Sequence, residues 1–199
     1  MIKIGVYSVQ GDVRENIVAL KDASSKAGLE YNVNTVVTPE QIMNLDAIIL
    51  PGGESTVIGG AGAKDGALRA IKEKAKAGMP VLGICAGMVL LAKQASDHTT
   101  GVTGQPLLGL LDMQVERNSF GHQGRSFEAD VCIAPLQIPK IHVAFIRAPS
   151  VLAVGSTVES IAEFDGKTVA VRSGKIIATA FHPELGADTS VYERFLETI

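Results

Sequence analysis

Hydrophobic residues follow two patterns in the first half of the chain: short apolar runs and longer amphipathic segments. The runs at 2–7, 46–50 and 80–84 are rich in Val, Ile and Leu, which is typical of strands buried on both faces. Helical patterns lie between the runs and carry start signals such as the capping-box pair Asp12 and Glu15. Repeated strand–helix units predict an open, mostly parallel sheet with helices on both faces.

The second half of the chain has a different pattern. Two hairpin-length turns, Asp165-Gly166 and Ser173-Gly174, separate short apolar segments and predict antiparallel strands. Residues 95–106 are polar and rich in Gly and Thr, and we interpret them as a surface loop. The predicted strands lie near 113–117, 127–133, 141–146, 158–164, 167–173 and 176–181, and a closing helix is expected over roughly 188–198. The pattern therefore predicts one α/β domain over residues 1–199, with an antiparallel extension.

Composition limits the classes of function. The chain has 199 residues, of which 46% are hydrophobic and 20% charged, and its net charge is −3. These values exclude a disordered chain and give no basic excess for binding nucleic acid. Two cysteines are too few for a disulfide scaffold, and no metal-ligand spacing is present. No apolar run has the length of a membrane span or a signal peptide, so we expect a soluble, cytoplasmic protein without a metal.

The strongest local signal is the segment Gly83-Ile84-Cys85-Ala86-Gly87, which lies between a predicted strand and a helical pattern over 86–93. This is the layout of a nucleophile elbow, with cysteine where related hydrolases have serine. Glycines are needed there because the turn is sharp and backbones pass close together. The free N–H groups of a helix N-terminus also stabilise a thiolate. A buried structural cysteine is the alternative, but the two flanking glycines favour a nucleophile.

A nucleophilic cysteine needs a base, and His182 is the best placed of the four histidines. It follows the apolar run 176–181, so we expect it at the carboxyl end of a strand, where open α/β sheets bind ligands. Glu184 lies two residues further on, and an extended backbone would point both side chains the same way. The three residues Cys85, His182 and Glu184 thus predict a nucleophile, a base and an orienting carboxylate. For His182 alone, a surface histidine would be the better interpretation.

The other histidines and the second cysteine receive structural interpretations. His98 is expected to be solvated in the polar loop, and His142 to lie on the surface of a strand. His122 lies in a glycine-hinged loop, where a role at the rim of a site stays open. Cys132, between two β-branched residues, is expected at a core or sheet position.

A second informative turn, Pro51-Gly52-Gly53-Glu54-Ser55-Thr56, follows the run 46–50. Adjacent glycines at a strand's carboxyl end expose backbone N–H groups, which bind a phosphate or a developing oxyanion. The phosphate is less favoured because no Gly-Lys-Ser/Thr follows, and a plain turn is the remaining alternative. Arg117 and Arg147, each near a predicted strand end, are candidates to bind a carboxylate, although a lone arginine is more often a surface residue.

Together these segments resemble the class I, triad-type glutamine amidotransferases. The Gly-Ile-Cys-Ala-Gly elbow, the His-Pro-Glu segment and the glycine pair have the layout of that family. Segments 51–56, 115–121 and 145–149 narrow the likeness to the glutaminase subunits of pyridoxal 5′-phosphate synthases. The resemblance covers nearly the whole chain and implies a flavodoxin-like fold. One departure is the segment 95–106, which is longer than the family leads us to expect.

The resemblance implies that the protein hydrolyses L-glutamine to glutamate and ammonia through a thioester on Cys85. It implies an oxyanion hole formed by backbone N–H groups near Gly52, Gly53 and Ala86. It also implies a glutamine site lined by Gly53, Glu54, Ser55, Arg117, Ile146 and Arg147. The ammonia would pass to a separate (β/α)₈-barrel synthase subunit. Pyridoxal phosphate would then be a product of the complex, and the chain itself would carry no cofactor.

Two alternatives remain open from the sequence. The first is the glutaminase of another amidotransferase, such as imidazole glycerol phosphate synthase, which shares the triad. The segments around Arg117 and Arg147 distinguish these two kinds of glutaminase. The second is a peptidase or redox protein with an elbow cysteine on the same type of sheet. His-Pro-Glu argues against it, and a glutamine hydrolysis assay decides.

Overall fold

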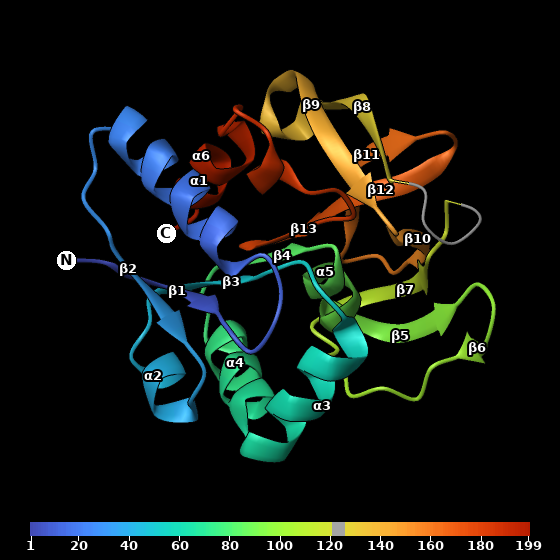
Figure 1. Cartoon of the computed structure of the whole chain (residues 1–199), viewed down its shortest axis with the longest axis horizontal. Helices are drawn as coiled ribbons and strands as arrows, with labels where there is room; N and C mark the ends of the chain where they lie inside the picture. Colours follow the sequence, from blue (N-terminus) through green and yellow to red (C-terminus); the bar gives the residue numbers. More distant parts are fainter. Residues whose placement is uncertain (121–125) are drawn as a thin grey trace.

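The computed structural model describes residues 1–120 and 126–199, and one large sheet runs through it (Figure 1). Within these residues the sheet has eleven strands. They are β1 (Lys3–Tyr7), β2 (Asn32–Val36), β3 (Ala47–Leu50), β4 (Val81–Ile84), β5 (Ala92–Asp97), β6 (Gly101–Val102), β7 (Leu111–Arg117), β10 (Ser150–Val154), β11 (Glu159–Phe164), β12 (Lys167–Ser173) and β13 (Ile176–Thr179). Their order is β2-β1-β3-β4-β13-β12-β10-β7-β5-β6, and β11, outside this order, pairs with β12.

The first half of the sheet is parallel. Strands β2, β1, β3, β4 and β13 are parallel neighbours in this order, so their carboxyl ends lie at the same edge. All four residues of β3 and of β4 are buried, as expected of strands covered on both faces. The segments that follow β1, β3, β4 and β13 therefore converge at one edge of the sheet.

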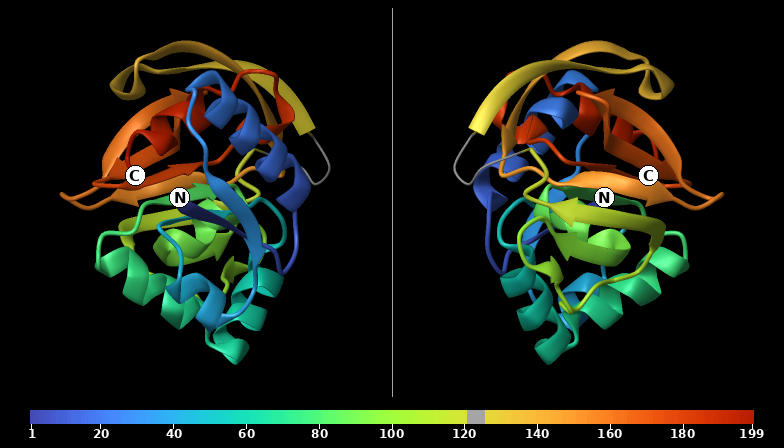
Figure 2. Two further views of the ribbon diagram at one scale, coloured as in Figure 1. Left: turned by 90° about the vertical axis from the view of Figure 1, so that its left-hand side faces the viewer. Right: turned by 90° about the vertical axis from the view of Figure 1, so that its right-hand side faces the viewer.

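Helices cover both faces of this parallel half. Helices α1 (Val13–Lys26) and α6 (Ser190–Leu196) pack together on one face. The opposite face carries α2 (Pro39–Met43), α3 (Ser55–Asp65), α4 (Ala67–Lys76) and α5 (Ala86–Leu91), and Figure 2 shows the two layers from the sides. The predicted α/β sheet with helices on both faces is confirmed. None of the helices in the described parts of the chain is long and apolar enough to cross a membrane.

The predicted antiparallel extension is also present. Strands β12, β10 and β7 continue the sheet in antiparallel pairing, while β5 joins β7 in parallel. A separate pair, β8 (Ser126–Ile133) and β9 (Ile138–Ile146), linked by the 3₁₀ turn η1 (Ala134–Leu136), arches over the face that carries α1 and α6 (Figures 1 and 2). Phe145 of β9 packs edge-on against Phe181, with ring centroids 5.7 Å apart. This contact fixes β9 against the segment that leads to His182.

Two local predictions are wrong in part. The helix predicted over 86–93 ends at Leu91, and Ala92 begins β5. The segment 95–106, expected as a loop, contributes the end of β5 and the edge strand β6. Tertiary pairing explains the difference, because β7 offers a free edge to β5 and Ala95 is buried against the core.

Candidate active site

Cys85 lies in the turn between β4 and α5, at the carboxyl end of the parallel strands. Its backbone has φ 48° and ψ −99°, a conformation that side-chain-bearing residues rarely adopt. The N–H of Cys85 donates to the carbonyl of Thr179 at the end of β13, at 2.7 Å. The turn is thus strained and anchored, as a nucleophile elbow requires.

The two glycines of the elbow are required by close packing. A Cβ at Gly83 would overlap the side chain of Leu91 and lie 2.9 Å from the backbone of Gly87. A Cβ at Gly87 would overlap the carbonyl oxygen of Leu50, which belongs to β3 and cannot move aside. Backbones therefore approach closely at both glycines, as the sequence predicts.

His182 follows β13 and is 3% exposed. Its backbone N–H donates to the carbonyl of Ala144 in β9, at 2.8 Å, which fixes the segment. Its Nδ1 atom lies 2.7 Å from Oε1 of Glu184, whose side chain is fully buried. The extended backbone predicted between the two residues is wrong, because Pro183–Leu185 form the 3₁₀ turn η2. The turn nevertheless brings the two side chains together.

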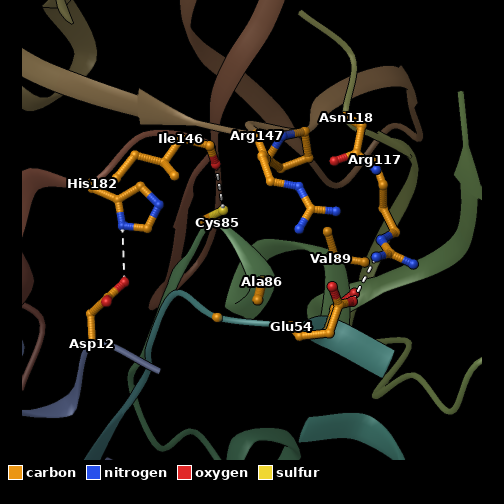
Figure 3. A pocket seen from close by; sticks show the side chains of 13 residues that line it. Asp12, Glu54, Cys85, Ala86, Val89, Arg117, Asn118, Ile146, Arg147 and His182 are labelled. Atoms are coloured by element: carbon orange, nitrogen blue, oxygen red, sulfur yellow. Dashed lines mark hydrogen bonds and ion pairs between the residues drawn. The ribbon is translucent and has the colours of Figure 1, made fainter. Parts of the chain in front are cut away.

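A second carboxylate, which the sequence does not reveal, contacts the same ring nitrogen. Oδ2 of Asp12 lies 3.3 Å from Nδ1 of His182 (Figure 3). The side chain of Asp12 makes no hydrogen bond to the N-terminus of α1, so the predicted capping box with Glu15 is wrong. The capping pattern is a local signal, whereas the contact with His182 joins residues 170 positions apart in sequence, which no local pattern indicates.

These neighbours set the charge of the histidine. Burial alone would lower the pKa of His182, but hydrogen bonds with Asp12, Cys85 and Glu184 outweigh burial and raise that pKa above its ordinary value. Burial raises the pKa of Glu184, while its hydrogen bond with His182 acts in the opposite direction. The hydrogen bond with His182 lowers the pKa of Asp12. The site therefore favours an imidazolium beside the Cys85 sulfur.

Asp12, His182 and Glu184 also form a group of potential metal ligands, with their ligand atoms within 4.8 Å of one another. Both carboxylates, however, already lie within contact distance of the same atom, Nδ1 of His182. The arrangement suits a hydrogen-bonded imidazolium, because two carboxyl groups can accept from its Nδ1–H.

The glycine pair lies beside Cys85. Gly53 has φ 149°, which favours glycine, and it lines the same pocket as Cys85 and Ala86. The carbonyl of Gly52 accepts from the N–H of Asp12 at 3.3 Å. Because the peptide is trans, the N–H of Gly53 points away from Asp12. Gly53 and Ala86 both line the pocket beside Cys85.

The pocket next to Cys85 has a volume of about 240 Å³ and suits a small, charged molecule. On its far side Arg117 donates to Oε1 of Glu54 at 2.6 Å. Figure 3 shows the guanidinium of Arg147 directed into the pocket, and no carboxylate of the described residues pairs with it. The lining residues are Asp12, Gly53, Glu54, Ser55, Cys85, Ala86, Val89, Arg117, Asn118, Ile146, Arg147, Pro149 and His182.

The structure thus brings together the site residues inferred from the sequence and leaves the others apart. His98 and His142 are exposed, as predicted, and neither lines the pocket. Cys132 lies in β8, as predicted, but its side chain is exposed, so the core interpretation is wrong. Its β-branched neighbours Val131 and Ile133 are buried, and because successive side chains of a strand point to opposite faces, Cys132 points outward. His122 lies outside the described residues.

Comparison with known proteins decides the family. The model of the SNO glutamine amidotransferase family matches residues 6–199. The chain belongs to this family. It is 45% identical to "Pyridoxal 5′-phosphate synthase subunit PdxT" of Nitrosopumilus maritimus, over 99% of this chain and 96% of that protein. It is 42% identical to the subunit of the same name from Saccharolobus solfataricus, over 100% of this chain and 99% of that protein.

A solved structure agrees with the assignment to the SNO glutamine amidotransferase family. The crystal structure of a glutamine amidotransferase is 38% identical in sequence and matches this chain with a TM-score of 0.83. The match covers 98% of this chain and 97% of that one. The amidotransferase family inferred from the sequence is confirmed, and the peptidase and redox alternatives are excluded.

Proposed function

We propose that this chain hydrolyses L-glutamine to L-glutamate and ammonia, as the glutaminase subunit of a pyridoxal 5′-phosphate synthase. The observation that carries the proposal is the meeting of Cys85, His182 and Glu184 at one edge of the sheet, beside a small pocket, in a member of a glutamine amidotransferase family. The names of the relatives favour this synthase over imidazole glycerol phosphate synthase.

In the first half of the reaction, Cys85 is the nucleophile. Its sulfur attacks the side-chain amide carbon of glutamine, and His182 accepts the thiol proton. His182 then gives that proton to the leaving nitrogen, the C–N bond breaks, and ammonia departs. A γ-glutamyl thioester on Cys85 remains. The raised pKa of His182 favours the imidazolium that this proton transfer requires.

In the second half of the reaction, water replaces the thiol. His182 accepts a proton from water, the resulting hydroxide attacks the thioester carbon, and the C–S bond breaks. The thiol regains the proton and glutamate leaves. Glu184 orients the base, because its buried carboxylate accepts from Nδ1–H and so presents Nε2 as the atom that exchanges protons.

Backbone N–H groups stabilise the oxyanion that forms in both steps. We assign this role to the N–H groups of Gly53 and Ala86, because both residues line the pocket beside Cys85 and Asp12 holds the carbonyl of Gly52. Each such donor is worth about 10²–10³ in rate. Ala86 also begins α5, so its N–H is one of the free donors of a helix N-terminus.

The two arginines have different roles in holding glutamine. Arg147, directed into the pocket without a carboxylate partner among the described residues, binds the α-carboxylate of the substrate. Arg117 fixes the carboxylate of Glu54, which is then placed to bind the α-ammonium group. The remaining lining residues that contact glutamine are Gly53, Ser55 and Ile146.

The released ammonia passes to a synthase subunit, for which we propose a (β/α)₈ barrel in a hetero-oligomeric complex. In this proposal the chain acts as one domain over residues 1–199 and carries no cofactor of its own. The thiol of Cys85 has to stay reduced, which suits the cytoplasm.

The proposal is tested by following the amide nitrogen of glutamine. We expect the wild-type chain, mixed with the synthase subunit, to release ammonia from L-glutamine. With ¹⁵N-amide glutamine and the sugar phosphate substrates of the synthase, the label should enter pyridoxal phosphate. Cys85→Ala should abolish both signals, and Cys132→Ala, which changes the other cysteine, should keep both. Ammonia release without transfer of the label would contradict the assigned partner, and no release at all would contradict the glutaminase assignment.

A further inference from the structure

Three segments meet beside His182 with no spare room. A Cβ at Gly11 would overlap the carbonyl oxygen of Gly52. A Cβ at Gly52 would overlap the ring of His182 and lie 2.7 Å from Oδ2 of Asp12. Asp12 is therefore packed between Gly52, which belongs to the glycine pair of the proposed oxyanion hole, and His182, the proposed base.

Asp12 contacts both of these neighbours through different groups. Its N–H donates to the carbonyl of Gly52, and its carboxylate reaches Nδ1 of His182, both at 3.3 Å. Asn16, one turn further along α1, donates from its side chain to the backbone carbonyl of Asp12 at 2.7 Å, and Tyr192 of α6 donates to Asn16 at 2.9 Å. Hydrogen bonds thus fix the backbone of Asp12 at both its N–H and its carbonyl. The position from which its side chain extends toward His182 is therefore fixed as well.

We propose that Asp12 is a positioning residue, a second carboxylate that shares Nδ1–H of His182 with Glu184 and stabilises the imidazolium in each proton transfer. The proposal rests on the proposed function. The two carboxylates differ in environment, because the side chain of Asp12 is 39% exposed and that of Glu184 is fully buried. A half-solvated carboxylate keeps its negative charge at little cost, whereas a buried one is expensive to ionise. Asp12 is therefore the carboxylate that ionises more readily, whereas Glu184 makes the shorter hydrogen bond to Nδ1.

The titratable groups that face His182 are few. Cys85 faces it from the elbow, Glu184 from η2 and Asp12 from the start of α1. Tyr192 of α6 lies near both carboxylates, and burial raises its pKa well above the ordinary value, so it stays neutral. A change in the titration of His182 after loss of the Asp12 charge is thus attributable to that charge.

The test measures the pKa of His182 by NMR in the Cys85→Ala background, which removes the sulfur beside the ring. Asp12→Asn keeps the size and the backbone N–H of the residue but removes its charge. We expect it to lower the pKa of His182 by about one unit or more, since an opposite charge within contact distance shifts a pKa by about 1–3 units. Asp12→Ala should do the same. Glu15→Gln removes an exposed charge one turn along the same helix and should leave the pKa unchanged.

Kinetics of the otherwise wild-type complex provide the second readout. Asp12→Asn should lower kcat for glutamine about tenfold, the factor that matches one pKa unit, with KM changed less than about twofold. Glu15→Gln should match the wild type. A kcat loss without a change in the pKa of His182, or equal pKa shifts in the Asp12 and Glu15 variants, would overturn the proposal. If Cys85→Ala still abolished activity, the proposed function would stand regardless.

Discussion

Nδ1 of His182 lies 2.7 Å from Oε1 of Glu184, and the side chain of Glu184 is fully buried. Burial raises the pKa of Glu184, while the hydrogen bond with His182 acts in the opposite direction and is strongest when the carboxylate is ionised. The geometry therefore indicates that Glu184 orients the base. Replacement of its carboxylate is expected to have a large effect on activity.

Glu184→Gln should lower kcat for glutamine by up to about 10⁴-fold, as loss of the orienting carboxylate does in a Ser-His-Asp triad. The amide nitrogen of Gln favours the wrong tautomer of His182, so Nε2 no longer accepts the thiol proton. Steady-state ammonia release in the presence of the synthase subunit measures the effect. His142→Ala is the matched control, because His142 also contacts two carboxylates but lies exposed on β9. Equal losses in the two variants would contradict the assignment.

Arg147→Ala should lower kcat/KM for glutamine by about ten- to 150-fold, the loss of one charge-assisted hydrogen bond worth about 1.5–3 kcal/mol. The reason is that Arg147 points into the pocket and has no competing carboxylate among the described residues. Arg172→Ala, which breaks an ion pair with Glu159 away from the pocket, should leave kcat/KM near the wild-type value.

A neutral alkylating reagent separates substrate binding from thiol chemistry. It should react with Cys85 at nearly the same rate in the wild type and in Arg147→Ala.

Arg117→Ala should also lower kcat/KM, because Glu54 loses the partner that fixes it. Wild-type kcat/KM in both arginine variants would make these residues structural.

Gly87→Ala should destabilise the fold, because the new methyl group would overlap the carbonyl oxygen of Leu50. Overpacking of a core typically costs about 1–3 kcal/mol, and each kcal/mol lowers Tm by about 2–4 °C for a chain of this size. Thermal unfolding of the isolated chain measures the loss. Gly60→Ala is the control, since a Cβ there meets nothing within 4 Å and Ala is the better helix former. An unchanged Tm in Gly87→Ala would show that the elbow can relax.

The sequence predicts those parts of the site that depend on local structure. The elbow around Cys85 is recognisable because its glycines, its strand and its helix are contiguous in the chain. The pair His182 and Glu184 is recognisable from its place after a strand, although the backbone between them is a 3₁₀ turn and not extended. The strand–helix alternation also sets the direction of the parallel strands, which is why the predicted site residues converge.

The parts that the sequence does not predict depend on distant contacts. Asp12 carries a capping pattern, and only the folded chain turns its carboxylate to His182. Helix α3 contains Gly59, Gly60 and Gly62, and because glycine is a poor helix former the sequence does not indicate a helix there. The N-terminus of α3 is fixed by Glu54. β10 has an irregular register, with a shift between Val151 and Ala153, and its pattern lacks the alternation of a regular strand.

Identification of the cysteine that forms the covalent intermediate is the sharpest test of the proposed mechanism. A glutamine analogue with an electrophile in place of the side-chain amide, incubated with the complex and followed by peptide mass spectrometry, should label one residue. We predict a single adduct on Cys85 and none on the exposed thiol of Cys132. L-Glutamine should protect against labelling, and His182→Asn should slow it. Labelling of Cys132 with Cys85 left free would contradict the assignment of Cys85 as the nucleophile.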